Sequence, residues 1–90
     1  MERKLEGHLG NVWCIKFFNK LNMLISGSED KMLKVWDFDS DFACVKTVYG
    51  HQSWINSISI SKDDLRLISG SLDKTIKVWD LKNFLCMHTI

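Results

Sequence analysis

The sequence predicts an all-β fold made of two four-stranded antiparallel units, and three observations lead to this prediction. The chain repeats itself: residues 50–80 align with residues 7–37 without a gap, and 14 of the 31 positions are identical. Short apolar runs alternate with turns rich in Gly, Asp, Asn and Ser, at a spacing of roughly ten residues. No segment keeps the 3.6-residue periodicity of a helix, so we expect a helix content close to nil.

Four strands follow one another in the first unit. Residues 12–18 are mostly apolar and aromatic, and a polar turn at 19–22 separates them from a second strand at 23–26. A turn at 27–31 leads to a third strand at 32–36, and a turn at 37–41 leads to a fourth at 43–49. Strands of this length joined by short turns predict a meander, in which each strand pairs with the next.

The second unit repeats this order with strands at 55–60, 66–69, 75–79 and 84–90. Side chains alternate along its third strand. Ile76 and Val78 are expected to point to one face of the sheet, and Lys77 and Trp79 to the other.

Composition excludes several classes of protein. The chain is 46% hydrophobic and 26% charged, with 12 basic residues scattered among 11 acidic ones, so no basic surface for nucleic acid or membrane is expected. Its longest apolar runs, 12–15 and 84–87, are far shorter than the roughly 20 residues that span a bilayer. The N-terminus also lacks the apolar segment of a signal peptide. We therefore expect an intracellular protein, cytoplasmic or nuclear.

The three cysteines are expected to be buried thiols. Cys14, Cys44 and Cys86 are odd in number, and each has apolar neighbours. This context suits small buried side chains better than a disulfide framework.

Two dipeptides mark the start and end of each repeat. Gly7-His8 recurs as Gly50-His51, and Trp36-Asp37 recurs as Trp79-Asp80. With four strands between them, these motifs resemble the WD40 repeat family, whose units are the blades of a β-propeller. The resemblance covers the chain as two repeats, residues 1–49, with a remnant of an N-terminal strand at 1–6, and residues 50–90. It implies two four-stranded WD40 blades and a partial or oligomer-completed β-propeller.

The resemblance also implies a structural tetrad in each repeat, formed by a His, a Ser, an Asp and a Trp. The eight residues are His8, Ser26, Asp30 and Trp36, then His51, Ser69, Asp73 and Trp79. An indole N–H only donates and a carboxylate only accepts, whereas Ser and neutral His do both. A directed chain from Trp through Ser and His to Asp therefore satisfies every member.

The sequence gives less support for an enzyme than for a structural role of these residues. Ser, His and Asp also make nucleophilic triads, but here the set occurs twice, each Ser is expected to bind a Trp, and no Gly-x-Ser-x-Gly sequence occurs. Cys86 and His88 share a strand face, yet two ligands are too few for zinc. The glycines of Ser-Gly-Ser precede no phosphate-binding helix and are expected in a tight turn. We expect no catalytic residue, no metal, no cofactor and no small-molecule substrate.

Partners are expected on the face that carries the loops before the first strand and between the second and third strands. The resemblance places six residues there: Leu9, Asn11, Glu29, Gln52, Trp54 and Leu72. Trp54 and Leu72 stand out as an aromatic and aliphatic anchor. The alternative is that Trp54 packs onto its own or a neighbouring blade. Trp13 lies within the first strand, where packing between blades is expected.

Two blades are too few for a closed ring, because propellers have about four to eight. Ile90 aligns with Val48, and residues 1–5 align with residues 44–48, so both ends resemble cuts through a longer array. Three interpretations stay open: a piece of a longer scaffold, a unit whose copies close a ring of six or eight blades, or a pair that docks onto another open propeller. We expect a non-catalytic protein-interaction scaffold whose partners are other proteins, further WD40 blades or copies of itself. Binding of nucleic acid, through a basic surface on blades beyond these, is a distant alternative.

Overall fold

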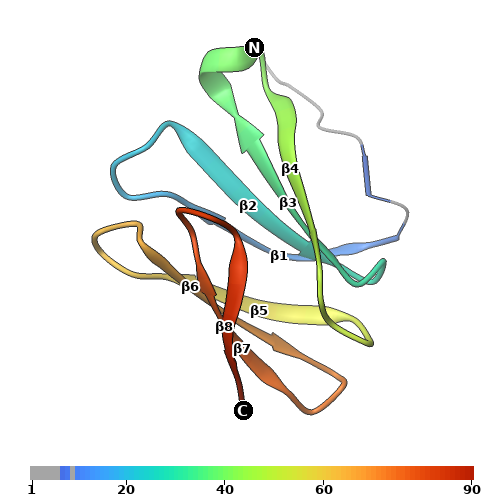
Figure 1. Cartoon of the computed structure of the whole chain (residues 1–90). Helices are drawn as coiled ribbons and strands as arrows, with labels where there is room; N and C mark the ends of the chain where they lie inside the picture. The colour runs from blue at the N-terminus through green and yellow to red at the C-terminus, as the bar shows by residue number, and fades with distance from the viewer. Residues whose placement is uncertain (1–6, 9) are drawn as a thin grey trace.

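Two four-stranded antiparallel sheets make up the computed structural model, which describes residues 7–8 and 10–90 (Figure 1). The first sheet contains β1 (Val12–Phe17), β2 (Met23–Ser28), β3 (Met32–Asp37) and β4 (Ala43–Tyr49). The second contains β5 (Ile55–Ile60), β6 (Arg66–Ser71), β7 (Ile76–Asp80) and β8 (Leu85–Thr89). Strands are paired in chain order, and one 3₁₀ turn, η1 (Phe38–Ser40), follows β3. The predicted all-β fold is confirmed. The predicted strand remnant at 1–6 lies outside the described residues.

The Ser-Gly-Ser segments lie within strands, so the tight turn expected for their glycines is wrong. β2 and β6 continue through these segments because Gly27 still pairs with Leu33, and Gly70 with Ile76. Gly27 is needed for close packing. A Cβ atom there would lie 2.8 Å from Cγ2 of Ile55 and 2.9 Å from Sγ of Cys14. Only a residue without a side chain lets β5 approach β2 this closely.

Bulges occur at equivalent places in the two sheets. On the first strand of each sheet, Trp13 and Asn56 have no residue opposite them, because pairing skips from Val12 to Cys14 and from Ile55 to Ser57. On the fourth strand, pairing likewise skips a residue beside Trp36 and beside Trp79. A bulge redirects the side chain of the extra residue.

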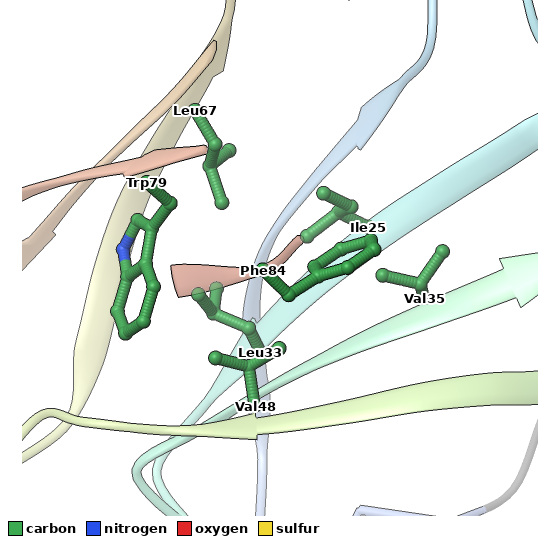
Figure 2. A pocket seen from close by; sticks show the side chains of 7 residues that line it. All are labelled: Ile25, Leu33, Val35, Val48, Leu67, Trp79 and Phe84. Atoms are coloured by element: carbon green, nitrogen blue, oxygen red, sulfur yellow. The ribbon is translucent and has the colours of Figure 1, made fainter. Parts of the chain in front are cut away.

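The sheets pack against each other through an apolar core. β1 lies beside β5, and the facing side chains come from β2, β3 and β4 on one side and from β5, β6 and β7 on the other (Figure 1). Figure 2 shows side chains of the two sheets meeting, with the ring of Phe84 directed into the contact. No space for a water molecule remains among them. Buried aliphatic side chains of this kind stabilise a fold by about 1.5 to 3 kcal/mol each.

Two of the cysteines are exposed, which corrects the expectation of three buried thiols. Cys44 and Cys86 lie on β4 and β8, the outermost strands, whose side chains are largely open to solvent. Cys14 is partly buried between the sheets, and burial raises the pKa of its thiol. All three thiols are free.

A buried carboxylate joins the two sheets at one end. Asp64, in the β5–β6 turn, accepts hydrogen bonds from the backbone N–H groups of Asn19 (2.8 Å) and Lys20 (2.6 Å) and from the side-chain amide of Asn19 (3.0 Å). The Asn19 amide also donates to the carbonyl of Ser61 at 2.9 Å. Asp64 has a left-handed backbone with φ of 60°, which Asp tolerates better than most residues. The second sheet thus caps the β1–β2 turn of the first.

The hydrogen bonds keep Asp64 ionised. Burial alone would raise the pKa of this carboxyl group, but the N–H donors of Asn19 and Lys20 outweigh burial and lower it below its ordinary value. The contact therefore stabilises the fold fully above about pH 4, and the stabilisation is lost as the pH falls towards the lowered pKa.

Asp64→Ala should loosen the contact between the sheets, because the N–H groups of Asn19 and Lys20 lose their acceptor. We expect faster hydrogen exchange at these two amides and a thermal midpoint lower by several degrees. Asp64→Asn should fall between Ala and the parent, since it keeps one acceptor oxygen. The matched control is Asp63→Asn, whose carboxylate accepts hydrogen bonds from Ser61 and Leu65 within its own turn. Equal exchange at Asn19 in the Asp64→Ala and Asp63→Asn variants would contradict the role of Asp64.

Candidate functional site

Four side chains form a hydrogen-bonded chain across the first sheet. Nε1 of Trp36 donates to Oγ of Ser26 at 3.0 Å, and this oxygen lies 2.6 Å from Nε2 of His8. Nδ1 of His8 lies 2.7 Å from Oδ2 of Asp30. The His8 and Asp30 side chains are both buried. Each residue of the first predicted tetrad therefore lies within hydrogen-bonding distance of the next, in the order Trp36, Ser26, His8 and Asp30.

The second sheet repeats this arrangement with its own four residues. Nε1 of Trp79 donates to Oγ of Ser69 at 2.8 Å, Ser69 Oγ lies 2.7 Å from Nε2 of His51, and His51 Nδ1 lies 3.1 Å from Oδ2 of Asp73. Thr75 adds to this network: its hydroxyl also binds the Asp73 carboxylate. Sequence reasoning missed Thr75, because the equivalent residue in the first sheet is Met32, which contributes only its backbone N–H to Asp30.

The donors and acceptors assign the proton positions. A carboxylate can only accept, so the Nδ1 atom facing it carries the proton, and Nε2 then accepts the Ser hydroxyl proton. The Ser oxygen in turn accepts the indole N–H. Each hydroxyl is thus held from two sides, and no buried side-chain nitrogen or oxygen of the described residues lacks a partner. Such a chain links the third strand, the second strand and the loop before the first strand.

The Gly of each Gly-His dipeptide makes room for the Trp of the same sheet. A Cβ atom on Gly50 would lie 2.5 Å from Cη2 of Trp79. The loop can therefore cross over the indole only where the residue before His51 has no side chain. The Asp of each Trp-Asp dipeptide has a local role, because Asp37 accepts from the N–H of Asp39 and Asp80 from that of Lys82, each capping the turn after its strand.

Asp73 is held as a carboxylate. Burial would raise the pKa of its carboxyl group, but hydrogen bonds from the Thr75 hydroxyl, the backbone N–H groups of Gln52 and Thr75, and His51 outweigh burial. Together they hold the pKa far below its ordinary value. Asp73 therefore fixes the loop that carries His51 in addition to His51 itself.

Four of the six residues predicted to meet partners form two hydrogen-bonded pairs, one in each sheet. In the first sheet the side-chain amide of Asn11 donates to Oε1 of Glu29 at 2.8 Å. In the second sheet the backbone N–H of Leu72 donates to the carbonyl of Trp54 at 3.0 Å. Gln52 is exposed beside them, whereas Leu9 lies outside the described residues. We call the surface formed by Asn11, Trp13, Glu29, Gln52, Trp54 and Leu72 the rim.

Trp13 belongs to this rim and packs between the blades as expected, but it lies at the surface of that contact and not in its core. The bulge at Trp13 turns its side chain out of the ladder, and its ring stacks on Trp54 with centroids 5.8 Å apart and planes 17° apart. Trp54 therefore packs on the neighbouring sheet, as one alternative expects, and it is also open to solvent, so that its role as a partner anchor stays a prediction. Trp13 is 51% exposed, Trp54 41% and Leu72 54%. Only the register of the bulge could have indicated this pairing.

The described part of the chain was compared with the requirements of a metal site and of a membrane-spanning helix. It contains no group of three His, Cys, Asp or Glu side chains placed to hold a metal ion. The thiol of Cys86 instead contacts the carbonyl of His88 and the hydroxyl of Thr89. No helix among these residues has the length and apolar content needed to cross a membrane.

Comparison with known families agrees with this geometry. The profile described as "WD domain, G-beta repeat" matches residues 1–37 and 42–80. The chain belongs to the WD40 repeat family. Each sheet is therefore a WD40 blade, the first containing β1–β4 and the second β5–β8.

Several WD40 relatives are fungal proteins. The chain is 41% identical over 61 residues to nuclear distribution protein nudF 1 of Talaromyces marneffei, covering 68% of this chain and 13% of the relative. It is 39% identical over 62 residues to nuclear distribution protein nudF of Aspergillus niger, covering 68% and 14%. It is 36% identical over 102 residues to mitochondrial division protein 1 of Vanderwaltozyma polyspora, covering 97% and 14%. The chain thus spans about one seventh of the length of these relatives.

His51→Ala should destabilise the second WD40 blade, because Ser69 and Asp73 each lose a buried partner. A cost of about 1 to 3 kcal/mol is expected. The thermal midpoint should fall by about 4 to 8 °C for each kcal/mol in a chain of this size. His88→Ala is the matched control, since His88 is exposed on β8. If the two variants melt at the same temperature in circular dichroism, the proposed contribution of His51 is wrong.

Acid should weaken the second blade through Asp73. Because the folded pKa lies below the unfolded value near 4, the stabilisation is complete above about pH 4 and declines as the pH falls further. We expect Asp73→Asn to melt below the parent at pH 6, and the gap between them to narrow between pH 4 and pH 2. Thermal melts of both proteins over this range provide the measurement. A gap that stays constant with pH would show that ionisation of Asp73 contributes nothing.

Proposed function

We propose that this chain is a non-catalytic protein-interaction scaffold module, with blades at residues 1–49 and 50–90, that works within a larger propeller. The observation that carries the proposal is the stacked Trp13–Trp54 pair on the rim, with Leu72 beside it. These side chains come from both blades, so the binding surface depends on the pair of blades being assembled.

The rim suits a protein partner. Trp is among the residues most often found at the energetic centre of interfaces, and exposed apolar side chains gathered in one place favour burial against another protein. The centre of the rim is apolar, with Trp13, Trp54 and Leu72. Polar side chains complete it, namely the hydrogen-bonded Asn11 and Glu29 in the first blade and Gln52 in the second. An apolar centre beside polar groups is the composition of a specific interface.

A catalytic use of Ser26 or Ser69 is disfavoured by their surroundings. Each hydroxyl is buried and accepts an indole N–H while it contacts a His ring. A nucleophile needs access to its substrate and a free lone pair directed at it. The tetrads are proposed to hold the loops of the rim in place and to perform no reaction.

The apolar side chains exposed on the outer faces of the two blades favour the proposal that the chain works within a larger propeller. Apolar side chains of β1 and of β6 and β7 are exposed on the outer sides of the pair, where further blades would cover them. We propose an intracellular location, which is supported by relatives whose names refer to nuclei and mitochondria. Partners are proposed to be proteins, without a small-molecule substrate, a membrane or direct nucleic-acid contact.

Removal of the rim anchors should abolish partner binding and leave the fold intact. We expect the double variant Trp54→Ala/Leu72→Ala to lose partners that the parent chain retains in quantitative affinity purification from cells that express it. Leu65→Ala is the matched control, since Leu65 is an exposed Leu in the β5–β6 turn, away from the rim. Circular dichroism verifies that all three proteins are folded. The same set of partners on parent and double variant would refute the role of the rim.

A further inference from the structure

Each blade has two faces, and one face of each is covered by the other blade. The first blade covers the second with Ile25, Leu33, Val35 and Val48, and the second blade presents Ile55, Ile58, Leu67 and Trp79 to them. These eight side chains, several of which appear in Figure 2, form the internal interface. On each remaining face, called the open face here, several apolar side chains are exposed to solvent.

The open faces repeat the residues of the internal interface. By the alignment, the open face of the second blade carries Ile68, Ile76, Val78 and Ile90 at the positions of Ile25, Leu33, Val35 and Val48. Ile90 is held beside Ile76 by two backbone hydrogen bonds, at 2.8 and 2.9 Å. Three of these side chains are 45% to 74% exposed, whereas their counterparts in the first blade are at most 7% exposed.

The open face of the first blade matches in the same way. It carries Val12, Ile15, Leu24 and Trp36 at the positions of Ile55, Ile58, Leu67 and Trp79. Val12 and Ile15 are about half exposed, whereas Leu24 and Trp36 lie beneath them and are at most 8% exposed. A hollow of about 190 Å³ is lined by these four residues with His8 and Ser26. In the second blade the equivalent surface is filled by side chains of the first blade, which leave no space for water.

We infer that copies of this chain dock head to tail, with the open face of the second blade of one copy against the open face of the first blade of the next. The inference rests on the proposal that the open faces receive further blades, and it names the partner. The internal interface is the template, because all eight of its positions recur as apolar side chains on the two open faces. Such a contact joins two different surfaces, so it leads to closed rings or to longer arrays and not to a twofold dimer.

The contact between copies should be weaker than the contact within one copy. Ser57 and Ser61 stand on the second blade where Cys14 and Phe18 stand on the first, so less apolar surface is available. Within one copy, the Asp64 carboxylate of the second blade binds the first blade. By the alignment, Leu21 of the first blade occupies the position of Asp64, so the contact between copies lacks this carboxylate. We therefore expect assembly to depend on protein concentration.

The test uses size-exclusion chromatography with light scattering on the whole chain and on two variants. The parent should show a mass that rises with concentration in multiples of 10.5 kDa. Ile68→Lys/Ile76→Lys removes one open face and Val12→Lys/Ile15→Lys removes the other, so each variant alone should remain at 10.5 kDa. Leu65→Lys, a new charge outside both faces, is the control and should assemble like the parent.

Mixing the two variants gives the decisive result. Each keeps one intact face, so the mixture should form a species of twice 10.5 kDa and nothing larger. If either double variant loses its β-type circular dichroism, Ile90→Lys or Val12→Lys replaces it, since both positions are strongly exposed.

Two outcomes would overturn the inference: a parent chain that stays folded at 10.5 kDa at every concentration, or variant mixtures that never form the heterodimer. Either outcome leaves the rim untouched, so affinity purification with Trp54→Ala/Leu72→Ala still decides the proposed function separately.

Discussion

The structure depends on the need to satisfy a line of buried polar groups inside each sheet. A sheet of four short strands has little depth, yet each blade buries an indole N–H, a hydroxyl, an imidazole and a carboxylate. These groups are stable there only because each one meets a partner of the opposite kind. The row of hydrogen bonds between these side chains joins the loop before the first strand to the second and third strands. The loop that carries the rim therefore has a fixed position relative to the sheet.

The apolar contact between the blades depends on this order. Trp79 donates its N–H to Ser69 and at the same time presents its ring to the first blade, so one side chain belongs to both the polar network and the core. Gly27 then allows Ile55 to approach closely, and Asp64 fixes the β1–β2 turn at the end of the contact. The same few residues thus make the hydrogen bonds of buried polar groups and the packing contacts between the blades.

Most of the fold was predictable from the sequence because the two repeats can be aligned with each other, so that each strand and turn is seen twice. Strand positions and the pairing order follow from local patterns that occur twice, and the resemblance to the WD40 family implied the two tetrads. Features that arise from a contact between blades were not predictable in this way. The role of Asp64 joins residues 45 positions apart, and nothing local distinguishes it from Asp63. The exposure of Trp13 was not predicted, because a bulge is not visible in a hydrophobic pattern. Cys44 and Cys86 were misplaced because the outermost strand of a blade is exposed despite its apolar composition.

The four tryptophans divide into two kinds of optical probe. Trp36 and Trp79 are buried, one in each blade, and their fluorescence reports whether the surrounding network is dry. Trp13 and Trp54 are stacked across the junction, so their electronic transitions are expected to couple, and this coupling weakens as the rings move apart. This coupling therefore reports how closely the two blades are held together at the rim. Separation of the blades would remove this coupling while the buried Trp of each blade kept its own emission.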